Sequence, residues 1–390
     1  YSTYLLARTE AAQPVAFAFG GEAEPVAYAR AMADGGLLAL LATLGLLQLG
    51  HETTPELAQL AAMSLALYAL AAAPFRVWRA RVPEVRRFVP WLLAELAISA
   101  ALATAIGGWR WRAHGLGVDE LPNLARQWLW FLWPCWPLAL WTLWRWRRQL
   151  LYRHVSVPLV IVLVALGANL AMGGSDRALL LGLPALAVLA AFALPTLKRS
   201  ATAAIDWFSM FFFTATALFI WVMYLAMQTG VPAKPAANVA KLAPGFEAPF
   251  SALALAFAVA GSLAWIAVVR WRTGRHQEAL WKSLVLPAGG VALCWLLLMT
   301  LWLPLLDHAR SARPLVARLQ PHVPASTPCI AAPGVSPANV AALEHFGRWR
   351  VDASPAALQG PCPLWLRVAR ELTLPPVPVG WDVVAVVPRP

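Results

Sequence analysis

Two charged residues stand side by side at the start of a long apolar run. Asp176 and Arg177 precede the apolar residues 178–194. A guanidinium at a membrane surface can hold a phosphate by charge-assisted hydrogen bonds while the helix below it lies beside a lipid tail. Arg177 is therefore a candidate for a lipid-phosphate site. The alternative is an ordinary snorkelling arginine that has Asp176 as its partner.

The elements that must position these residues are membrane helices. Of the 390 residues, 60% are hydrophobic and only 13% are charged, whereas soluble domains carry roughly 25% charged residues. A helix needs an apolar run of roughly 17 to 25 residues to cross a ~30 Å hydrocarbon core. A β-barrel strand would instead show about ten residues of alternating apolar and polar character. We predict an all-α polytopic membrane protein with about nine transmembrane helices. The runs are 33–50, 57–75, 88–108, 128–144, 155–172, 178–195, 203–227, 250–269 and 283–305.

Basic residues alternate between the connecting loops, which predicts an orientation. Every second loop is rich in arginine and lysine, as the positive-inside rule requires of cytoplasmic loops. The loop 50–56, residues 110–127, the segment 173–177, residues 229–249 and the chain after 306 then face outward. Attraction of the basic cytoplasmic loops to anionic lipid explains the net charge of +12, and binding of nucleic acid is not needed to explain it. The basic residues are Arg76, Arg79, Arg81, Arg86, Arg87, Arg145, Arg147, Arg148, Arg153, Lys198, Arg199, Arg270, Arg272, Arg275 and Lys282.

Glu95 and Asp206 are ionisable residues inside predicted spans. Burial of a charge in hydrocarbon is costly enough to require an interhelical partner or a water-filled cavity. A structural role and a functional role are both open for each of them.

The chain divides into three parts by composition. Residues 1–32 read as a cytoplasmic connection, 33–306 as the transmembrane domain and 307–390 as a small soluble α/β domain on the extracytoplasmic side. In the last part, the segments TPCIAA, RWRVD, PLWLRVA and WDVVAVV predict short strands. The segment SPANVAALEHF predicts a helix with Ser336 as its N-cap and Pro337 at its first position.

Cysteine usage agrees with that sidedness. Cys329 and Cys362 both lie in the outward domain, where an oxidising compartment allows a disulfide that closes a loop of about 30 residues. Cys135 and Cys294 lie within spans and are expected to act as small apolar residues. No Cys/His spacing resembles a zinc site.

Residues 176–195, DRALLLGLPALAVLAAFALP, resemble the signature of polyprenyl-phosphate-dependent glycosyltransferases. This family-39-like group of the C-superfamily is related to protein O-mannosyltransferases and aminoarabinose transferases. Arg177 falls on the family arginine and residues 184–186 on its P-A-L, while Ala178 replaces a tyrosine and Gly182 a proline. Residues 50–70, GHETTPELAQLAAMSLALYAL, are similar to the outward turn R-x-A-T-x-D and its following helix. The order of spans and the outward C-terminal domain are also similar.

The resemblance implies a site and a reaction. His51 takes the arginine position of the outward turn, Thr54 the threonine position and Glu56 the acidic position. A sugar would pass from an undecaprenyl-phosphate-type carrier to an extracytoplasmic glycan, lipid or protein acceptor. A carboxylate would act as general base on the acceptor hydroxyl, and Glu52 and Glu56 are the acidic candidates.

Further ligands of the site are less specific. Lys234 and Lys241 could hold phosphate or close over the site, or form a solvated loop. The partners implied are a polyprenyl-phosphate-linked sugar and membrane lipids, and a divalent metal stays open. The implied location is a bacterial inner membrane.

One departure from the family concerns the N-terminal end. The family base is an aspartate in the first outward loop, after a first span, and here no such span precedes the cytoplasmic start. Since the chain starts at Tyr1, without Met or signal segment, we expect an N-terminal part to be missing from this sequence.

Two other functions stay open. A transporter or flippase of lipid-linked sugars would also need many spans, but the sequence shows no inverted repeat with paired broken helices. A non-catalytic membrane assembly protein is favoured if the gene product starts near Tyr1.

Overall fold

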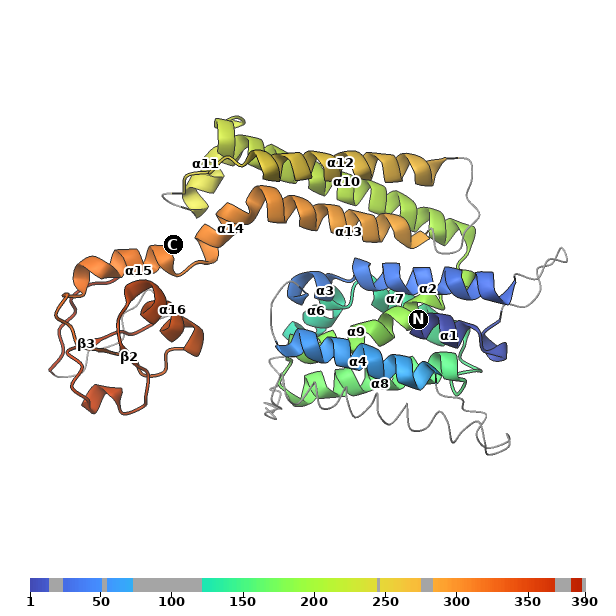
Figure 1. Cartoon of the computed structure of the whole chain (residues 1–390), viewed down its shortest axis with the longest axis horizontal. Helices are drawn as coiled ribbons and strands as arrows, with labels where there is room; N and C mark the ends of the chain where they lie inside the picture. Colours follow the sequence, from blue (N-terminus) through green and yellow to red (C-terminus); the bar gives the residue numbers. More distant parts are fainter. Residues whose placement is uncertain are drawn as a thin grey trace. The chain divides into compact units, whose positions relative to one another are not determined.

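The computed structural model describes residues 1–13, 24–50, 55–72, 121–243, 246–274, 283–368 and 380–387. They are mostly helical and belong to two compact units (Figure 1). The first unit is Tyr1–Leu218 with Ala258–Leu297, and the second is Phe219–Phe257 with Leu298–Pro390.

The first unit is built of helices. They are α1 (Ser2–Ala7), α2 (Pro25–Ala42), α3 (Leu44–Leu49), α4 (Pro55–Ala72), α6 (Leu121–Phe131), α7 (Cys135–Arg145), α8 (Arg153–Ala171), α9 (Asp176–Ala191), the start of α10 (Arg199–Thr229), most of α12 (Ala252–Thr273) and α13 (Val285–Leu297), with 3-10 turns at Glu10–Ala12 and Leu194–Thr196.

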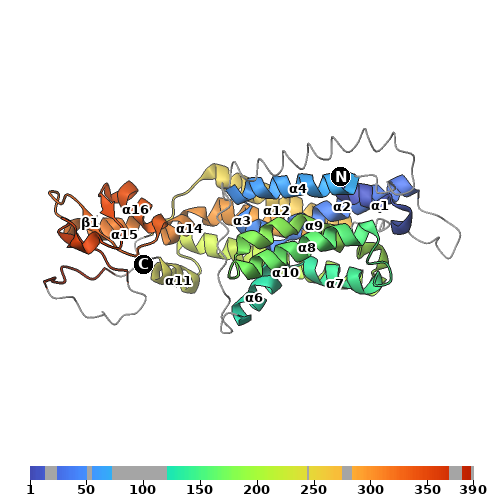
Figure 2. The ribbon, with the colours of Figure 1, turned by 90° about the horizontal axis from the view of Figure 1, so that it is seen from below.

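Helix α9 forms the centre of this unit. It packs against α2, α3, α4, α7 and α8, and both ribbon views show α8 running beside it (Figure 1, Figure 2). In its apolar window 83% of the residues are buried, compared with 22% for α10 and 11% for α12. Because α9 is apolar on all sides, it requires neighbours all round. The Thr142 hydroxyl also donates to the Leu189 carbonyl at 2.7 Å, which joins α7 to α9.

Five helices in the described part of the chain are long and apolar enough to cross a membrane. Large apolar side chains remain exposed on α8 and α10, for example Val164, Phe208 and Phe211, as expected of helices that face lipid. The candidates are Arg153–Ala171, Asp176–Thr196, Ser200–Thr229, Ala252–Thr273 and Val285–His322. They correspond to the last five predicted spans. The second predicted span is the shorter apolar helix α4, and the third, 88–108, lies outside the described residues.

The first and fourth predicted spans are not continuous helices, which corrects the sequence prediction. The first breaks at Thr43, between α2 and α3, and the fourth breaks between α6 and α7, where Pro134 is the N-cap of α7. Proline lacks the N–H that a continuous helix needs. At Thr43 the backbone is extended, with φ −74° and ψ 124°, and no proline is responsible.

The two breaks meet and close each other. The Leu44 N–H, at the first position of α3, donates to the Trp133 carbonyl at 2.9 Å. Buried Thr43 and Cys135 lie 3.3 Å apart from hydroxyl oxygen to sulfur, and each donates to the Ala39 carbonyl. Orphan backbone groups at helix ends must find a partner when water is absent. Here the Leu44 N–H at one break is hydrogen-bonded to the Trp133 carbonyl at the other.

A glycine permits this close approach. A Cβ atom added to Gly45 would lie 2.7 Å from the backbone oxygen of Phe131 and against its ring. Such a separation is well inside van der Waals contact. The crossing of α2–α3 and α6–α7 therefore depends on the absence of a side chain at position 45.

The second unit holds the end of α10, the start of α12 and the C-terminal elements. These are α11 (Ala233–Leu242), a π-helical turn Leu298–Trp302, α14 (Leu303–Arg310), α15 (Arg313–Leu319), 3-10 turns Gln320–His322 and Ala357–Gln359, β1 (Ile330–Ala331), α16 (Pro337–Gly347), β2 (Val351–Asp352) and β3 (Leu364–Trp365). The three short strands form a parallel sheet in the order β2-β1-β3, in which Ile330 lies opposite Val351 and Leu364.

Helix α16 begins as the sequence predicts. The Ser336 hydroxyl accepts a hydrogen bond from the Asn339 N–H, and Pro337 is the first helical residue. The segments TPCIAA, RWRVD and PLWLRVA contain β1, β2 and β3. The fourth predicted strand, WDVVAVV, is not a strand, and Val383, Val384 and Val386 are exposed. β-Branched residues favour a strand only where a neighbouring strand pairs with them.

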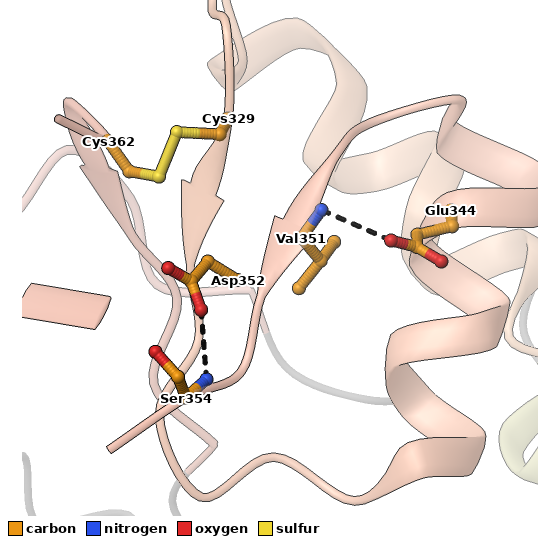
Figure 3. The surroundings of a disulfide bond; sticks show 6 residues. All are labelled: Cys329, Glu344, Val351, Asp352, Ser354 and Cys362. Atoms are coloured by element: carbon orange, nitrogen blue, oxygen red, sulfur yellow. Dashed lines mark hydrogen bonds between the residues drawn. A yellow bond between two sulfur atoms is a disulfide. The ribbon is translucent and has the colours of Figure 1, made fainter. Parts of the chain in front are cut away.

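The disulfide between Cys329 and Cys362 closes the side of the sheet opposite α16 (Figure 3). The Cα atoms of this pair, which the sequence favours, lie 5.0 Å apart, within the usual 4.4 to 6.8 Å range. On the side of the sheet that faces α16, the Glu344 carboxylate accepts from the Val351 N–H at 3.3 Å and links α16 to β2. The predicted domain boundary at residue 307 stays a prediction.

Candidate functional site

Arg177 and Glu56 meet at one end of the first unit. Glu56 lies in the first turn of α4 and Arg177 in the first turn of α9. The Arg177 Nη1 atom lies 2.8 Å from Glu56 Oε1, and the exposed fractions of the two side chains are 50% and 23%. The pair therefore joins two of the predicted outward segments, residues 50–56 and 173–177.

Asp176 has a different neighbour. Its Oδ2 atom accepts from the Gln48 side-chain amide at 3.5 Å, the long limit for a hydrogen bond. Gln48 lies in the last turn of α3. The two adjacent charges of the sequence thus face different helices.

A tight turn between α8 and α9 presents these charges. Gly173 and Gly174 have φ values of 65° and 84°, a backbone region that is open to glycine at little cost. The Gly174 N–H donates to the Asn169 carbonyl at 2.8 Å. The turn reverses the chain within four residues, so that α9 starts next to the end of α8.

A buried asparagine fixes the turn. The Asn169 side-chain amide donates to the Ser175 carbonyl at 2.7 Å, and its oxygen accepts from the Trp128 indole N–H at 2.8 Å. Gln127 donates to the Gly174 carbonyl at 2.9 Å. Asn169 is fully buried. A buried amide side chain needs hydrogen-bond partners, and these contacts supply them. The start of α9 is consequently held by α6 as well as α8.

This arrangement can exchange one anion for another. An exposed guanidinium with a fixed backbone carries several donors for an oxyanion, and the Glu56 carboxylate occupies one of them. A carboxylate is also a group that can accept a proton. Within the described ranges no group of three or more His, Cys, Asp or Glu side chains is placed to hold a metal.

The structure does not test the other residues predicted for the site. His51, Glu52 and Thr54 lie outside the described residues. Lys234 and Lys241 are exposed on α11, in the second unit, whereas Arg177 belongs to the first. Their part in the site stays a prediction.

Of Asp206 and Glu95, the structure describes Asp206. Asp206 on α10 forms a bidentate ion pair with Arg272 on α12. The Arg272 Nε atom lies 3.2 Å from Asp206 Oδ1, and Nη2 lies 2.6 Å from Oδ2. Arg272 is 8% and Asp206 21% exposed. Asp206 therefore has the interhelical partner that its position requires, and its role is to join two spans. Glu95 lies outside the described residues.

Gln48, Gln127 and Asn169 were not among the residues predicted for the site. Their signal was an amide side chain within or at the end of an apolar run, because polar residues in a membrane helix need partners. Asn169 lies three residues before the end of the predicted span 155–172, so its need for a hydrogen-bond partner could have been predicted from the sequence.

Comparison with known proteins gives no relative. No family model, curated protein or solved structure matches this chain.

Proposed function

We propose that this chain is a membrane glycosyltransferase, or the C-terminal portion of one, that uses a polyprenyl-phosphate-linked sugar. Arg177 would bind the carrier phosphate at the outward membrane boundary. The observation that carries the proposal is the half-exposed Arg177 guanidinium at the head of the buried helix α9, with a carboxylate as its partner.

The proposal includes the finer membrane arrangement. It takes about nine spans, cytoplasmic basic loops, an extracytoplasmic C-terminal domain and a bacterial inner membrane. Two contacts support the alternation of the loops. Arg153 donates to the Leu70 and Ala71 carbonyls at 3.0 Å each, at the C-terminal end of α4, whereas Glu56 at the other end of α4 contacts Arg177. One end of α4 thus meets a basic segment and the other meets the candidate site.

In the proposed reaction, an acceptor hydroxyl oxygen bonds to the anomeric carbon of the sugar while the bond from that carbon to the phosphate oxygen breaks. The proton of the hydroxyl passes to a carboxylate, for which Glu52 and Glu56 are the candidates. The leaving polyprenyl phosphate takes the negative charge, and the Arg177 guanidinium stabilises it.

The test measures carrier binding. The full chain in lipid nanodiscs is titrated with farnesyl phosphate and with farnesol as the uncharged control. Arg177→Ala should weaken farnesyl phosphate binding at least tenfold, and Arg177→Lys should recover it only partly, because lysine lacks the planar fork. Asp176→Asn is the matched control and should keep the wild-type affinity. An unchanged affinity in Arg177→Ala would refute the assignment.

One observation favours a transporter or flippase as the second candidate. The breaks of α2–α3 and α6–α7 meet through Leu44 and Trp133, and the absence of paired broken helices was the argument against transport. Broken helices that face each other form substrate sites in many transporters. Movement of a fluorescent farnesyl phosphate across proteoliposomes that contain the chain, without an acceptor, would favour transport over transfer.

A further inference from the structure

We infer that Glu56 is an internal competitor for the phosphate-binding face of Arg177, and that an anionic ligand binds by displacing it. The inference rests on the proposed function and concerns the regulation and selectivity of the same site. It starts from the contact between Glu56 Oε1 and Arg177 Nη1 at 2.8 Å.

The charges make the two ligands of Arg177 exclusive. A phosphate that approaches the occupied guanidinium donor meets a carboxylate a few ångströms away, and like charges at that distance repel each other. A second charge-assisted bond at the same donor would require the carboxylate to move. Binding of phosphate therefore includes the rupture of the Glu56 contact.

The exposed fractions allow this exchange. At 50% exposure the Arg177 guanidinium is accessible while paired, and Glu56 at 23% is the more enclosed partner. Ion pairs that are partly exposed contribute little stability, so the contact is weak enough for a stronger anion to replace it. In the Asp206–Arg272 pair the guanidinium is only 8% exposed, so an anion from solvent has less access to it.

The competition implies a preference for charge. A carboxylate ligand gains little over the carboxylate already present, whereas a doubly charged phosphate monoester has a stronger attraction to the guanidinium. The site is thereby selective for a phosphate monoester, of the kind that a carrier lipid has after it loses its sugar, over carboxylate ligands.

Asp176 supplies a control within the same turn. Its carboxylate is next to Arg177 in sequence but contacts Gln48. If only the local negative charge mattered, removal of either carboxylate would have the same effect. If displacement matters, Glu56 alone has a large effect.

The experiment uses the full chain in nanodiscs with farnesyl phosphate as the probe. Glu56→Gln should tighten binding about fivefold, and Asp176→Asn should change it less than twofold, as expected for a partly exposed pair and a neighbouring charge. Glu56→Ala serves as the second variant, and thermal unfolding confirms that each variant is folded. In the Glu56→Gln/Arg177→Ala double variant the gain should vanish.

The outcomes separate this inference from the proposed function. Loss of binding in Arg177→Ala without a gain in either Glu56 variant would overturn the competition and leave the phosphate site. A gain that persists in the double variant, or that Asp176→Asn reproduces, would also overturn it. Inorganic phosphate is titrated in parallel: a gain for farnesyl phosphate alone identifies a lipid headgroup, and an equal gain for inorganic phosphate identifies a free phosphate. Both results support the displacement of Glu56.

Discussion

Arg177 and Glu56 form an ion pair across 121 positions of the chain, with 2.8 Å between Nη1 and Oε1. The contact links the first turns of α4 and α9. It places an ion pair at the exposed end of α9, which is the most buried of the five candidate spans in the described residues, and the proposed phosphate chemistry starts from this pair.

Asn169 should be needed for the shape of the site. Asn169→Leu removes the hydrogen bonds to Ser175 and Trp128 and leaves their polar groups without this partner, at a cost of about 1 to 3 kcal/mol. We expect a lower midpoint of thermal unfolding and weaker farnesyl phosphate binding. Asn238→Leu, at an exposed position of α11, is the control and should change neither. Equal effects of the two substitutions would contradict the role of Asn169.

The crossing of the broken helices should depend on Gly45. Gly45→Ala places a methyl group 2.7 Å from the Phe131 carbonyl oxygen, and we expect a loss of about 1 to 3 kcal/mol from overpacking. Gly167→Ala is the matched control, since nothing lies within 4 Å of its added Cβ on α8 and alanine favours a helix. Denaturant titration of both variants tests this. A Gly45→Ala variant as stable as Gly167→Ala would show that the crossing is loose.

The ion pair between Asp206 and Arg272 should matter as a pair. Asp206→Leu alone should destabilise by about 3 to 5 kcal/mol, because it leaves the buried Arg272 charge without its partner. Arg272→Met should cost less, because the Asp206 side chain is 21% exposed. The double variant should regain most of that loss. A double-mutant cycle from unfolding titrations gives the coupling energy, and strictly additive losses would argue against a direct interaction.

The orientation of the spans can be tested with one cysteine on α11, before α12, and one at the last residue of α12. Asn238→Cys on α11, which precedes α12, should react with an impermeant maleimide on intact cells. Thr273→Cys, the last residue of α12, should react only after the membrane is opened. The wild-type background is low, because Cys135 and Cys294 are buried and the other two cysteines form the disulfide. The reverse pattern would invert the proposed topology.

Stability at acid pH should depend on Asp352. The Ser354 backbone N–H donates to its carboxylate at 2.9 Å and holds the pKa of Asp352 below its usual value (Figure 3). The charged form therefore stabilises the fold above the unfolded pKa of about 3.9, and this contribution is lost as pH falls through the lower folded pKa. The Tm difference between wild type and Asp352→Asn should thus shrink below about pH 4. A constant difference from pH 6 to about pH 2.5 would rule out this role.

Some of these features could be predicted from the sequence because their cause is local. Ser336 and Pro337 mark the start of α16 through capping chemistry that needs only neighbouring residues. The apolar runs of α8, α9, α10, α12 and α13 are continuous, so length and composition suffice to recognise them. Pro134 carried a local signal for the break of the fourth span.

Other features depend on contacts between distant segments. Nothing beside Thr43 breaks a helix. Its extended backbone accompanies the bond from Leu44 to Trp133 and the approach of Cys135. The partner of Arg177 was also beyond local reasoning, which placed Asp176 first because it is adjacent. Tertiary packing decides in both cases, and sequence patterns record it only weakly.

The crossing at Leu44 and Trp133 bears on the order in which the protein is made. When α2 and α3 have been synthesised, the Leu44 N–H lacks the carbonyl that it meets in the finished fold, because Trp133 has not yet been synthesised. An unpaired N–H is costly where water is absent. The Leu44 N–H therefore gains its native partner only after the α6–α7 segment has been added to the chain.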